Sequence, residues 1–421
     1  MPPISHRVIA CCLPSPLLLE SAVSIFASVA LAPSDPILGL TDAWLADPRS
    51  PKVNLGVGVY YDEEGRQTLP EAVRRAEEAL VAQHRARGYI PIDGLPAYDE
   101  ATQALLFGTD SPLRAAGRVV TAQTLGGTGA LRVGADFLKA TLPQAKVAIS
   151  CPSWPNHEVL FRAAGFEIVE YPYYHAASHG VDFDAMRDAL MALEPGTVVL
   201  LHACCHNPTG ADLSLVQWQQ VAQVLRERAL IPFVDLAYQG FDRGISEDAE
   251  GIAVLLGAGI DTVIVANSYS KSFSLYGERV GALSLVCADA DEASRVRSQV
   301  KQTIRATYSN PPTHGAALVA AVLGSVELRS LWESELTTMR ERIKAMRHGL
   351  TVRLAAQGRP EFDFIDRQAG MFTYSGLSKA QVARLRDEFA IYAVDSGRIC
   401  ISALNNANLD YVARAIAQVS A

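Results

Sequence analysis

The sequence predicts an α/β fold with a mostly parallel, seven-stranded sheet between helices, plus a small α+β unit built from both chain ends. From residue 119 onward, short β-branched runs alternate with segments that have the 3.6-residue spacing of helices. Such alternation is typical of a parallel sheet covered on both faces. The chain of 421 residues is also too long for one ordinary domain.

Seven apolar runs are the expected strands of the sheet. They occupy residues 119–122, 146–150, 167–171, 197–202, 232–236, 262–266 and 282–286. Residues 214–228 are the clearest helix between them, because Trp218, Val221 and Leu225 fall on one face. Residues 312–357 have the spacing of a long helical stretch. Residues 53–61 read as a strand between turns that pairs with the C-terminal unit.

We expect two domains in close contact. The large one comprises residues 67–337, and the small one combines residues 32–66 with 338–421. Residues 1–31 form an N-terminal extension. Prolines and Glu20 interrupt its apolar pieces well short of the roughly 20 residues that span a bilayer. An unstructured extension, or a start codon placed too early, is favoured over an export signal, although Arg7 does precede an apolar stretch.

Charge and cysteine content narrow the class of protein. The formal net charge is −8 with no dense run of Lys and Arg, so we expect no nucleic-acid partner. Seven scattered cysteines without a C-x-x-C pair favour free thiols in a reducing compartment, the cytoplasm. The cluster of His202, Cys204, Cys205 and His206 suggests zinc, but adjacent cysteines in an extended segment point to opposite faces. We therefore expect no metal. Because the apolar pieces of the N-terminal extension are too short to span a bilayer, we also expect no membrane partner.

A lysine at a strand end is the strongest chemical feature. Ser268, Ser270 and Lys271 directly follow the apolar run 262–266, and ligands collect at strand ends in α/β sheets. Taken alone, Lys271 is better explained as a solvated surface lysine, because lysines are mostly exposed. Arg279 follows eight residues later, so two hydroxyls and two cations meet at this point. Together they predict a phosphate site with an amine inside it.

A glycine-rich turn offers a second phosphate element. Gly126-Gly127-Thr128-Gly129 follows a strand and opens the helical segment 130–140. Glycines permit close backbone approach, and the free N–H groups at a helix N-terminus bind anions. An ordinary glycine turn is the alternative. A dinucleotide site is not supported, because no glycine follows Gly129 at the required spacing.

Two further polar residues follow buried strands. Asp235 lies near the end of the run 232–236, with Tyr238 three residues later. A buried carboxylate needs a partner, which a protonated pyridine nitrogen would supply, although a helix cap is the alternative. Asn207 precedes Pro208, which holds it in an extended or turn conformation and fixes its side-chain amide. An amide held there could bind a phenolic oxygen on a cofactor, although N-P-T-G by itself is simply a good turn.

Five ordered motifs together resemble the class I aspartate/aromatic aminotransferases, which depend on pyridoxal 5'-phosphate (PLP). The motifs are SYSKSFSLYGERVG (268–281), CCHNPTG (204–210), DLAYQGF (235–241), GGTGALRVGADF (126–137) and PSWPNH (152–157). The likeness runs from about residue 32 to the C-terminus. It implies the transferase fold of type I, with PLP bound by the large domain. The stretch before Thr128 and residues 229–238 look closer to the tyrosine (aromatic) branch than to the aspartate branch.

The resemblance implies roles for individual residues. Lys271 would be the Schiff-base lysine and Asp235 the partner of the pyridine nitrogen. Tyr238, the third catalytic residue, would bind the phenolate oxygen with Asn207, and Trp154 would stack on the ring. The phosphate would be held by Gly127, Thr128, Ser268, Ser270 and Arg279, and by Tyr89 of a neighbouring subunit. His157 and His202 would contact Asp235 and its surroundings.

Substrate contacts and assembly are implied in the same way. Arg398 matches the arginine that binds the substrate α-carboxylate, and Gly58 would line the entrance. Arg305 matches the arginine that binds a distal carboxylate from the other subunit, which implies a homodimer with shared active sites. The expected reaction is ping-pong transfer of an amino group from tyrosine or phenylalanine, and also from aspartate, to 2-oxoglutarate.

Other functions stay open at this point. Aspartate aminotransferase proper is the nearest alternative, since Tyr61, Gln67 and Gly88 leave the preferred donor undecided. A decarboxylase could use the same lysine, but a carboxylate clamped by Arg398 is not positioned to leave. A non-catalytic, effector-binding PLP domain would need a basic DNA-binding unit, and the N-terminal extension is not basic.

Overall fold

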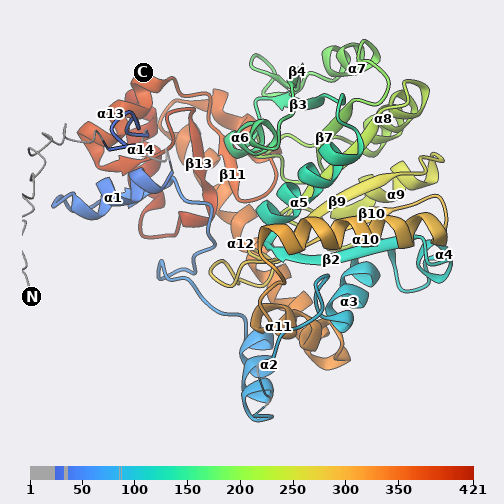
Figure 1. Ribbon diagram of the computed structural model, residues 1–421. Coiled ribbons are helices and arrows are strands. Elements are labelled where there is room, and N and C mark those ends of the chain that lie inside the picture. Colours follow the sequence, from blue (N-terminus) through green and yellow to red (C-terminus); the bar gives the residue numbers. More distant parts are fainter. Residues whose placement is uncertain (1–23, 33–36, 85, 87) are drawn as a thin grey trace, which may run out of the picture. The chain divides into compact units, whose positions relative to one another are not determined.

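The computed structural model describes residues 24–32, 37–84, 86 and 88–421 (Figure 1). Residues 1–35 form a unit of their own, in which a turn is closed by a hydrogen bond from the Ala27 N–H to the Ser24 carbonyl at 2.9 Å. The expectations of an unstructured extension and of no export signal fall mainly on residues 1–23, which lie outside the described residues. The elements below all belong to the second unit, residues 36–421.

All seven expected runs form one sheet, so this prediction is confirmed. The strand order is β2 (Val119–Leu125), β10 (Val280–Val286), β9 (Val263–Ser268), β8 (Ile231–Leu236), β7 (Val198–His202), β3 (Val147–Cys151) and β4 (Ile168–Pro172). β10 is antiparallel to both neighbours, and every other pairing is parallel. The central strands β7, β8 and β9 are mostly apolar because both faces of the sheet are buried there, whereas the edge strand β4 is partly exposed.

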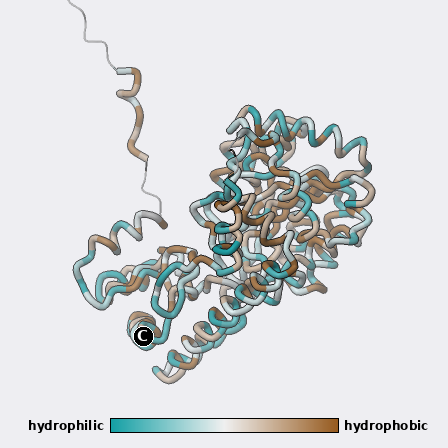
Figure 2. Tube along the Cα trace, turned by 90° about the horizontal axis from the view of Figure 1, so that it is seen from below, coloured by the Kyte–Doolittle hydropathy of each residue, from teal (hydrophilic) through white to brown (hydrophobic). Residues whose placement is uncertain are grey.

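Helices cover both faces. Along β7, Val198 and Leu200 join one core cluster, whereas Val199 and Leu201 join the other, as the two-residue period of a strand requires. The first cluster is closed by α5 (Gly126–Thr141), α6 (Pro155–Ala163) and α10 (Ala290–Thr307). The second is closed by α3 (Pro96–Phe107), α7 (Phe183–Met191), α8 (Leu215–Glu227), α9 (Glu250–Gly257) and α11 (His314–Leu323). In Figure 2 brown, hydrophobic segments gather toward the middle of the larger part of the tube.

The predicted helix 214–228 is confirmed as α8, and its first turn shows why it begins there. The Ser214 hydroxyl accepts a hydrogen bond from the Gln217 N–H at 3.3 Å, and the Gln217 side chain accepts one from the Ser214 N–H at 2.8 Å. This reciprocal capping box satisfies two N–H groups that a helix start otherwise leaves free. Trp218, Val221 and Leu225 are buried, as their spacing predicted.

The long helical stretch 312–357 is divided in two. α11 ends before Gly324, and α12 (Val326–Ala356) starts after Ser325, whose hydroxyl accepts a hydrogen bond from the Leu328 N–H at 3.3 Å. Gly324 and this new cap break the helix, and the two parts are bent by 99°. Among the described residues no single helix is long and apolar enough to cross a membrane. Only α11 and α12 taken together reach the necessary apolar length, and they are sharply bent against each other.

The two ends of the unit meet, as expected. β1 (Val53–Asn54) pairs in parallel with β12 (Ile391–Tyr392). The strand expected over 53–61 is only two residues long, because the chain bends at Gly56 and Val57 and the Val59 N–H bonds to the Val57 carbonyl at 3.1 Å. The other short elements are α1 (Leu38–Ala46), α2 (Glu71–Val81), α4 (Pro112–Ala115), β5 (Tyr174–His175), β6 (Gly180–Val181), η1 (Glu247–Ala249), η2 (Pro360–Arg367), β11 (Phe372–Tyr374), α13 (Lys379–Phe389), β13 (Arg398–Cys400), η3 (Ile401–Ala403) and α14 (Leu409–Val419).

This topology positions a site. The parallel strands β3, β7, β8 and β9 end at the same edge of the sheet. Trp154 follows β3 and Asn207 follows β7. Asp235 is the second-last residue of β8, and Lys271 follows β9. Four polar or aromatic side chains that are far apart in the sequence therefore arrive at one place.

Candidate active site

One cavity of about 260 Å³ collects nearly all the residues singled out above. Lys271 lies on its wall between the strand ends and the C-terminal segment that carries Arg398. The predicted site residues that line it are Gly58, Gly127, Thr128, Trp154, Asn207, Asp235, Tyr238, Ser268, Ser270, Lys271, Arg279 and Arg398. His202 lines it as well.

Lys271 has the properties of a nucleophilic amine. Burial lowers its pKa to about 8. The Asp235 carboxylate acts to raise the pKa, whereas the Arg279 and Arg398 charges act to lower it further. Its Nζ lies 4.8 Å from the centre of the Tyr238 ring. Because the neutral amine is the reactive form, this side chain is primed to attack a carbonyl or to accept a proton near physiological pH.

Asp235 is held ionised by a histidine. Burial acts to raise its pKa, but the hydrogen bond from His157 and nearby charges, including Lys271, outweigh it and leave the pKa below its usual value. Its Oδ2 accepts from the His157 Nε2 at 3.0 Å, and the His157 Nδ1 is 2.9 Å from the Ser153 hydroxyl. The expectation that His157 contacts Asp235 agrees with this geometry. Asp235 therefore presents a fixed negative charge to the cavity.

His202 stands beside this pair in neutral form. Its ring centre is 5.1 Å from that of His157, and burial lowers its pKa to about 3. Ligand atoms of His157, His202 and Asp235 lie within 4.8 Å of one another. Since both ring nitrogens of His157 are already engaged by Ser153 and Asp235, we interpret the group as a network that orients the carboxylate.

The glycine-rich turn and the lysine loop form one anion cradle. α5 begins at Gly126 without a side-chain cap, so its first N–H groups are free to bind an anion. Gly126 has φ +70°, and a Cβ there would lie 2.5 Å from the Arg279 Nη2. The Arg279 Nη1 donates to the Ser270 hydroxyl at 3.3 Å, and the Ser268 hydroxyl accepts the Ser270 N–H at 3.2 Å. Backbone donors, two hydroxyls and a cation thus surround one point.

Arg398 is a buried cation with only neutral partners among the described residues. It is 4% exposed, and burial lowers its pKa. Its guanidinium donates to Asn207 Oδ1 at 3.2 Å and to the Gly56 carbonyl at 2.7 Å, and it lies 4.2 Å from the centre of the Phe372 ring. Its Nε is buried without a hydrogen-bond partner in the described chain. Such an arrangement is suited to a carboxylate ligand.

Five residues that line the cavity were not singled out from the sequence, namely Ile37, Leu131, Ala237, Tyr276 and Phe372, and two of them make contacts that matter for the site. Phe372, on β11, packs so closely against Gly58 that a Cβ there would lie 2.4 Å from its ring. The Tyr276 hydroxyl accepts the Tyr60 N–H at 2.9 Å. Phe372 follows the apolar Met371 and looks like a core residue in sequence. Tyr276 lies inside the motif 268–281, so its place between Lys271 and Arg279 was the signal that could have found it.

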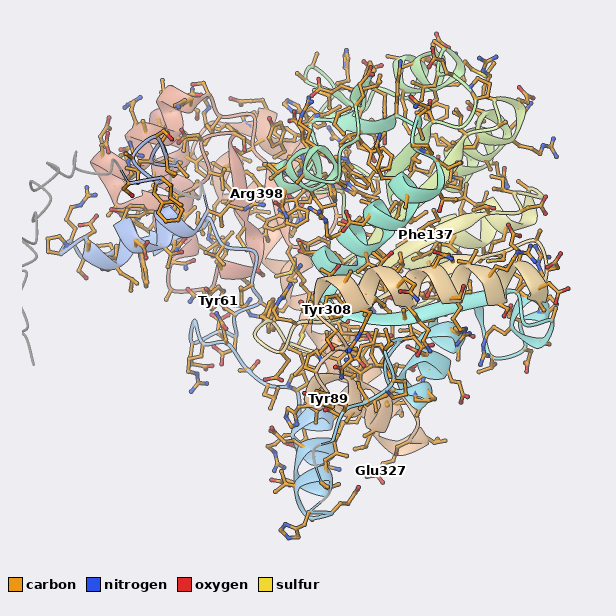
Figure 3. All side chains as sticks on the ribbon, in the orientation of Figure 1. Tyr61, Tyr89, Phe137, Tyr308, Glu327 and Arg398 are labelled. Carbon is orange, nitrogen blue, oxygen red and sulfur yellow. The ribbon has the colours of Figure 1, made fainter. Side chains whose placement is uncertain are left out.

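Tyr89 and Arg305 do not reach the cavity of their own chain. Tyr89 is 96% exposed. Arg305, near the end of α10, is exposed, donates to the Ser309 hydroxyl, and borders a separate groove with Arg297 and Lys301. Figure 3 shows Tyr89 and Arg398 in different parts of the unit. Tyr89 and Arg305 therefore lie outside the site that a single chain forms.

Comparison with known proteins agrees with this geometry. Residues 50–416 match the family model described as aminotransferase class I and II. The aspartate aminotransferase of Pseudomonas aeruginosa is 57% identical over 398 residues, covering 94% of this chain and 100% of the relative. The aromatic-amino-acid aminotransferase of Escherichia coli is 50% identical with the same coverage.

Solved structures give the same result. The aromatic-amino-acid aminotransferase of Burkholderia pseudomallei, solved covalently bound to pyridoxal phosphate, superimposes with a TM-score of 0.91 at 60% identity, covering 94% of this chain and 100% of that one. The cytoplasmic aspartate aminotransferase of Saccharomyces cerevisiae superimposes with a TM-score of 0.91 at 35% identity, covering 94% and 98%. On its motifs, its site and these matches, the chain belongs to the class I and II aminotransferases.

Proposed function

We propose that this PLP-dependent aminotransferase takes its amino group from tyrosine and phenylalanine, and also from aspartate, and passes it to 2-oxoglutarate. One observation carries the proposal: a reactive lysine, an ionised aspartate, an anion cradle and a buried carboxylate-binding arginine share a single cavity. Each matches one part of the reaction, namely the amine, the cofactor ring, the cofactor phosphate and the substrate.

The residues present fit PLP. The free N–H groups at Gly127 and Thr128, with Ser268, Ser270 and Arg279, would hold its phosphate; Asp235 would pair with its pyridine nitrogen. Trp154 would stack on the ring, and Tyr238 and Asn207 would bind the phenolate oxygen. When bound, PLP supplies an electron sink for the electrons left on the substrate α-carbon.

The chain's own groups divide the remaining work. Lys271, with its lowered pKa, would hold the cofactor through its Nζ, and as a free neutral amine it would accept the proton from the substrate α-carbon. Asp235, ionised through its His157 contact, would keep positive charge on the ring nitrogen. Arg398 binds the α-carboxylate and holds it away from the geometry of decarboxylation.

Donor preference rests on other observations. Relatives and neighbours named aromatic-amino-acid or tyrosine aminotransferase support aromatic donors. Tyr61 is partly buried and follows Gly58 and Tyr60 in the chain, and because a phenol is uncharged near neutral pH it would offer a donor side chain a ring rather than a charge. Aspartate aminotransferase proper is the second candidate, supported by the relative of that name at 57% identity.

We also propose a homodimer with shared active sites. In a dimer, Tyr89 would reach the phosphate and Arg305 the distal carboxylate of the partner's substrate. The exposure of both side chains in the single chain supports this assignment. We further propose a small domain of residues 32–66 and 338–421 beside a large domain of 67–337, supported by the β1–β12 pairing, and a cytoplasmic location, supported by five free cysteines in the described chain.

Steady-state assays with tyrosine, phenylalanine and aspartate against 2-oxoglutarate test the proposal. Turnover of all three donors, with kcat/KM for the aromatic donors at least equal to that for aspartate, is the expected result. Turnover of aspartate alone would assign the chain to the second candidate. Binding of PLP without turnover of any donor would instead support a non-catalytic, effector-binding role.

A further inference from the structure

A short segment at the cavity entrance, residues 55–60, is tied down mainly from the C-terminal side. The Leu55 carbonyl accepts the Cys400 N–H at 2.8 Å, and the Val59 carbonyl accepts the Ser402 hydroxyl at 2.7 Å. The Gly56 carbonyl accepts Arg398 at 2.7 Å. The backbone of this segment therefore helps to set the position of Arg398.

The opposite end of the segment is tied to the lysine loop by one side chain. The Tyr60 N–H donates to the Tyr276 hydroxyl at 2.9 Å, and the Tyr60 side chain is buried. Tyr276 itself lines the cavity. Because a buried N–H is costly to leave without an acceptor, the Tyr276 hydroxyl fixes where this end of the segment lies.

Tyr276 is tied in turn to the anion cradle. Its carbonyl accepts the Arg279 Nη1 at 3.0 Å, and the same nitrogen reaches the Ser270 hydroxyl at 3.3 Å. Arg279 adopts φ +55°, a left-handed conformation that a non-glycine residue keeps only when its surroundings hold it there. An anion bound to Arg279 would order its guanidinium and so the turn that contains Tyr276.

We infer that Tyr276 is a positioning residue that connects the anion cradle to segment 55–60, so that an anion at Arg279 steadies this segment and, through the Gly56 carbonyl, Arg398. The inference rests on the proposed function, in which Arg279 binds the cofactor phosphate. It adds a physical link between the phosphate end and the carboxylate end of the site. Coupling of this kind is a difference in free energy shared by two binding events.

Amide hydrogen exchange of the cofactor-free, full-length protein, with and without inorganic phosphate, tests the link. Phosphate is expected to slow exchange of the Tyr60 amide by about fivefold or more in the wild type, a typical lower size for coupling between sites. In Tyr276→Phe the slowing is expected to fall below about twofold, while phosphate still binds with similar affinity. Tyr269→Phe is the matched control, since its hydroxyl lies in the same loop but pairs with Thr102 at 2.9 Å.

The possible outcomes separate the link from the proposed function. Equal slowing in Tyr276→Phe and wild type would overturn the link, as would phosphate binding without any slowing at Tyr60 in the wild type. Either result leaves the anion cradle standing. Failure of phosphate to bind the wild type would overturn the cradle and the link together. If Tyr276→Phe does not fold, the wild type still tests the link, because phosphate must slow the Tyr60 amide more than the Val53 amide, which is bonded to the Ala390 carbonyl. Equal slowing of both amides would overturn the link.

Discussion

Replacement of Arg398 by alanine tests the substrate side of the site. The change removes a buried cation and leaves Asn207 Oδ1 and the Gly56 carbonyl without their donor. Since Arg398 has no carboxylate partner among the described residues, its charge is available to the α-carboxylate that every amino acid substrate carries. The loss should therefore be the same for aromatic and acidic donors.

The size of the loss follows from the burial of the charge. Removing one partner of a buried, hydrogen-bonded charge pair costs about 2 to 5 kcal/mol, which is roughly 30-fold to several thousand-fold in a rate constant. Because Arg398 is only 4% exposed, solvent screens the pair little. We expect kcat/KM to fall within this range for tyrosine, phenylalanine and aspartate in single half-reactions.

Two controls isolate the charge from the fold. Arg398→Lys keeps the cation but loses the forked donor geometry, so it should lie between alanine and wild type. Thermal unfolding of each variant shows whether the hydrogen bonds to Asn207 and Gly56 are needed for stability. A folded Arg398→Ala enzyme with kcat/KM within about threefold of wild type, or with a loss confined to aspartate, would refute the assignment of this arginine to the α-carboxylate.

Three further predictions concern the other charges. Asp235→Asn should slow the single-turnover chemical step about 100-fold or more while PLP still binds, because the amide cannot hold charge on the ring nitrogen; a near-normal rate would make Asp235 structural. In the cofactor-free protein, the rate at which an acylating reagent modifies Lys271 should rise with pH around a midpoint near 8, since the neutral amine is the nucleophile. Asp235→Asn should lower that midpoint, because the carboxylate raises the pKa of Lys271, and a wild-type midpoint near 10.5 would contradict the effect of burial. Arg305→Leu should lower kcat/KM for aspartate far more than for phenylalanine in half-reactions, whereas equal losses would make Arg305 structural.

The sheet and the centre of the site could both be predicted from where the apolar runs end. Central strands buried on both faces are mostly apolar, so the polar residues that follow mark their ends. Asn207, Asp235 and Lys271 stand at such ends, and parallel strands bring these ends to one edge. The pattern of the sequence thus carried both the fold and the chemistry at this edge.

The remaining parts could not be predicted for physical reasons. Phe372 looks like a core residue in sequence, and only the folded chain places it on the cavity wall. The strand expected over 53–61 ends after two residues because the backbone at Gly56 is used to bind Arg398. The hydrogen bond between Arg398 and the Gly56 carbonyl joins residues far apart in the sequence, so the residues around Gly56 alone could not predict it.

The covalent attachment of PLP to Lys271 is the central claim, and borohydride reduction followed by peptide mass spectrometry tests it most directly. The protein loaded with PLP should be yellow, and reduction should fix the cofactor to the peptide that contains Lys271. Lys271→Ala should still bind PLP in the anion cradle without being labelled there, and it should have no turnover. Attachment of the reduced cofactor to any other lysine in the wild type would contradict the account.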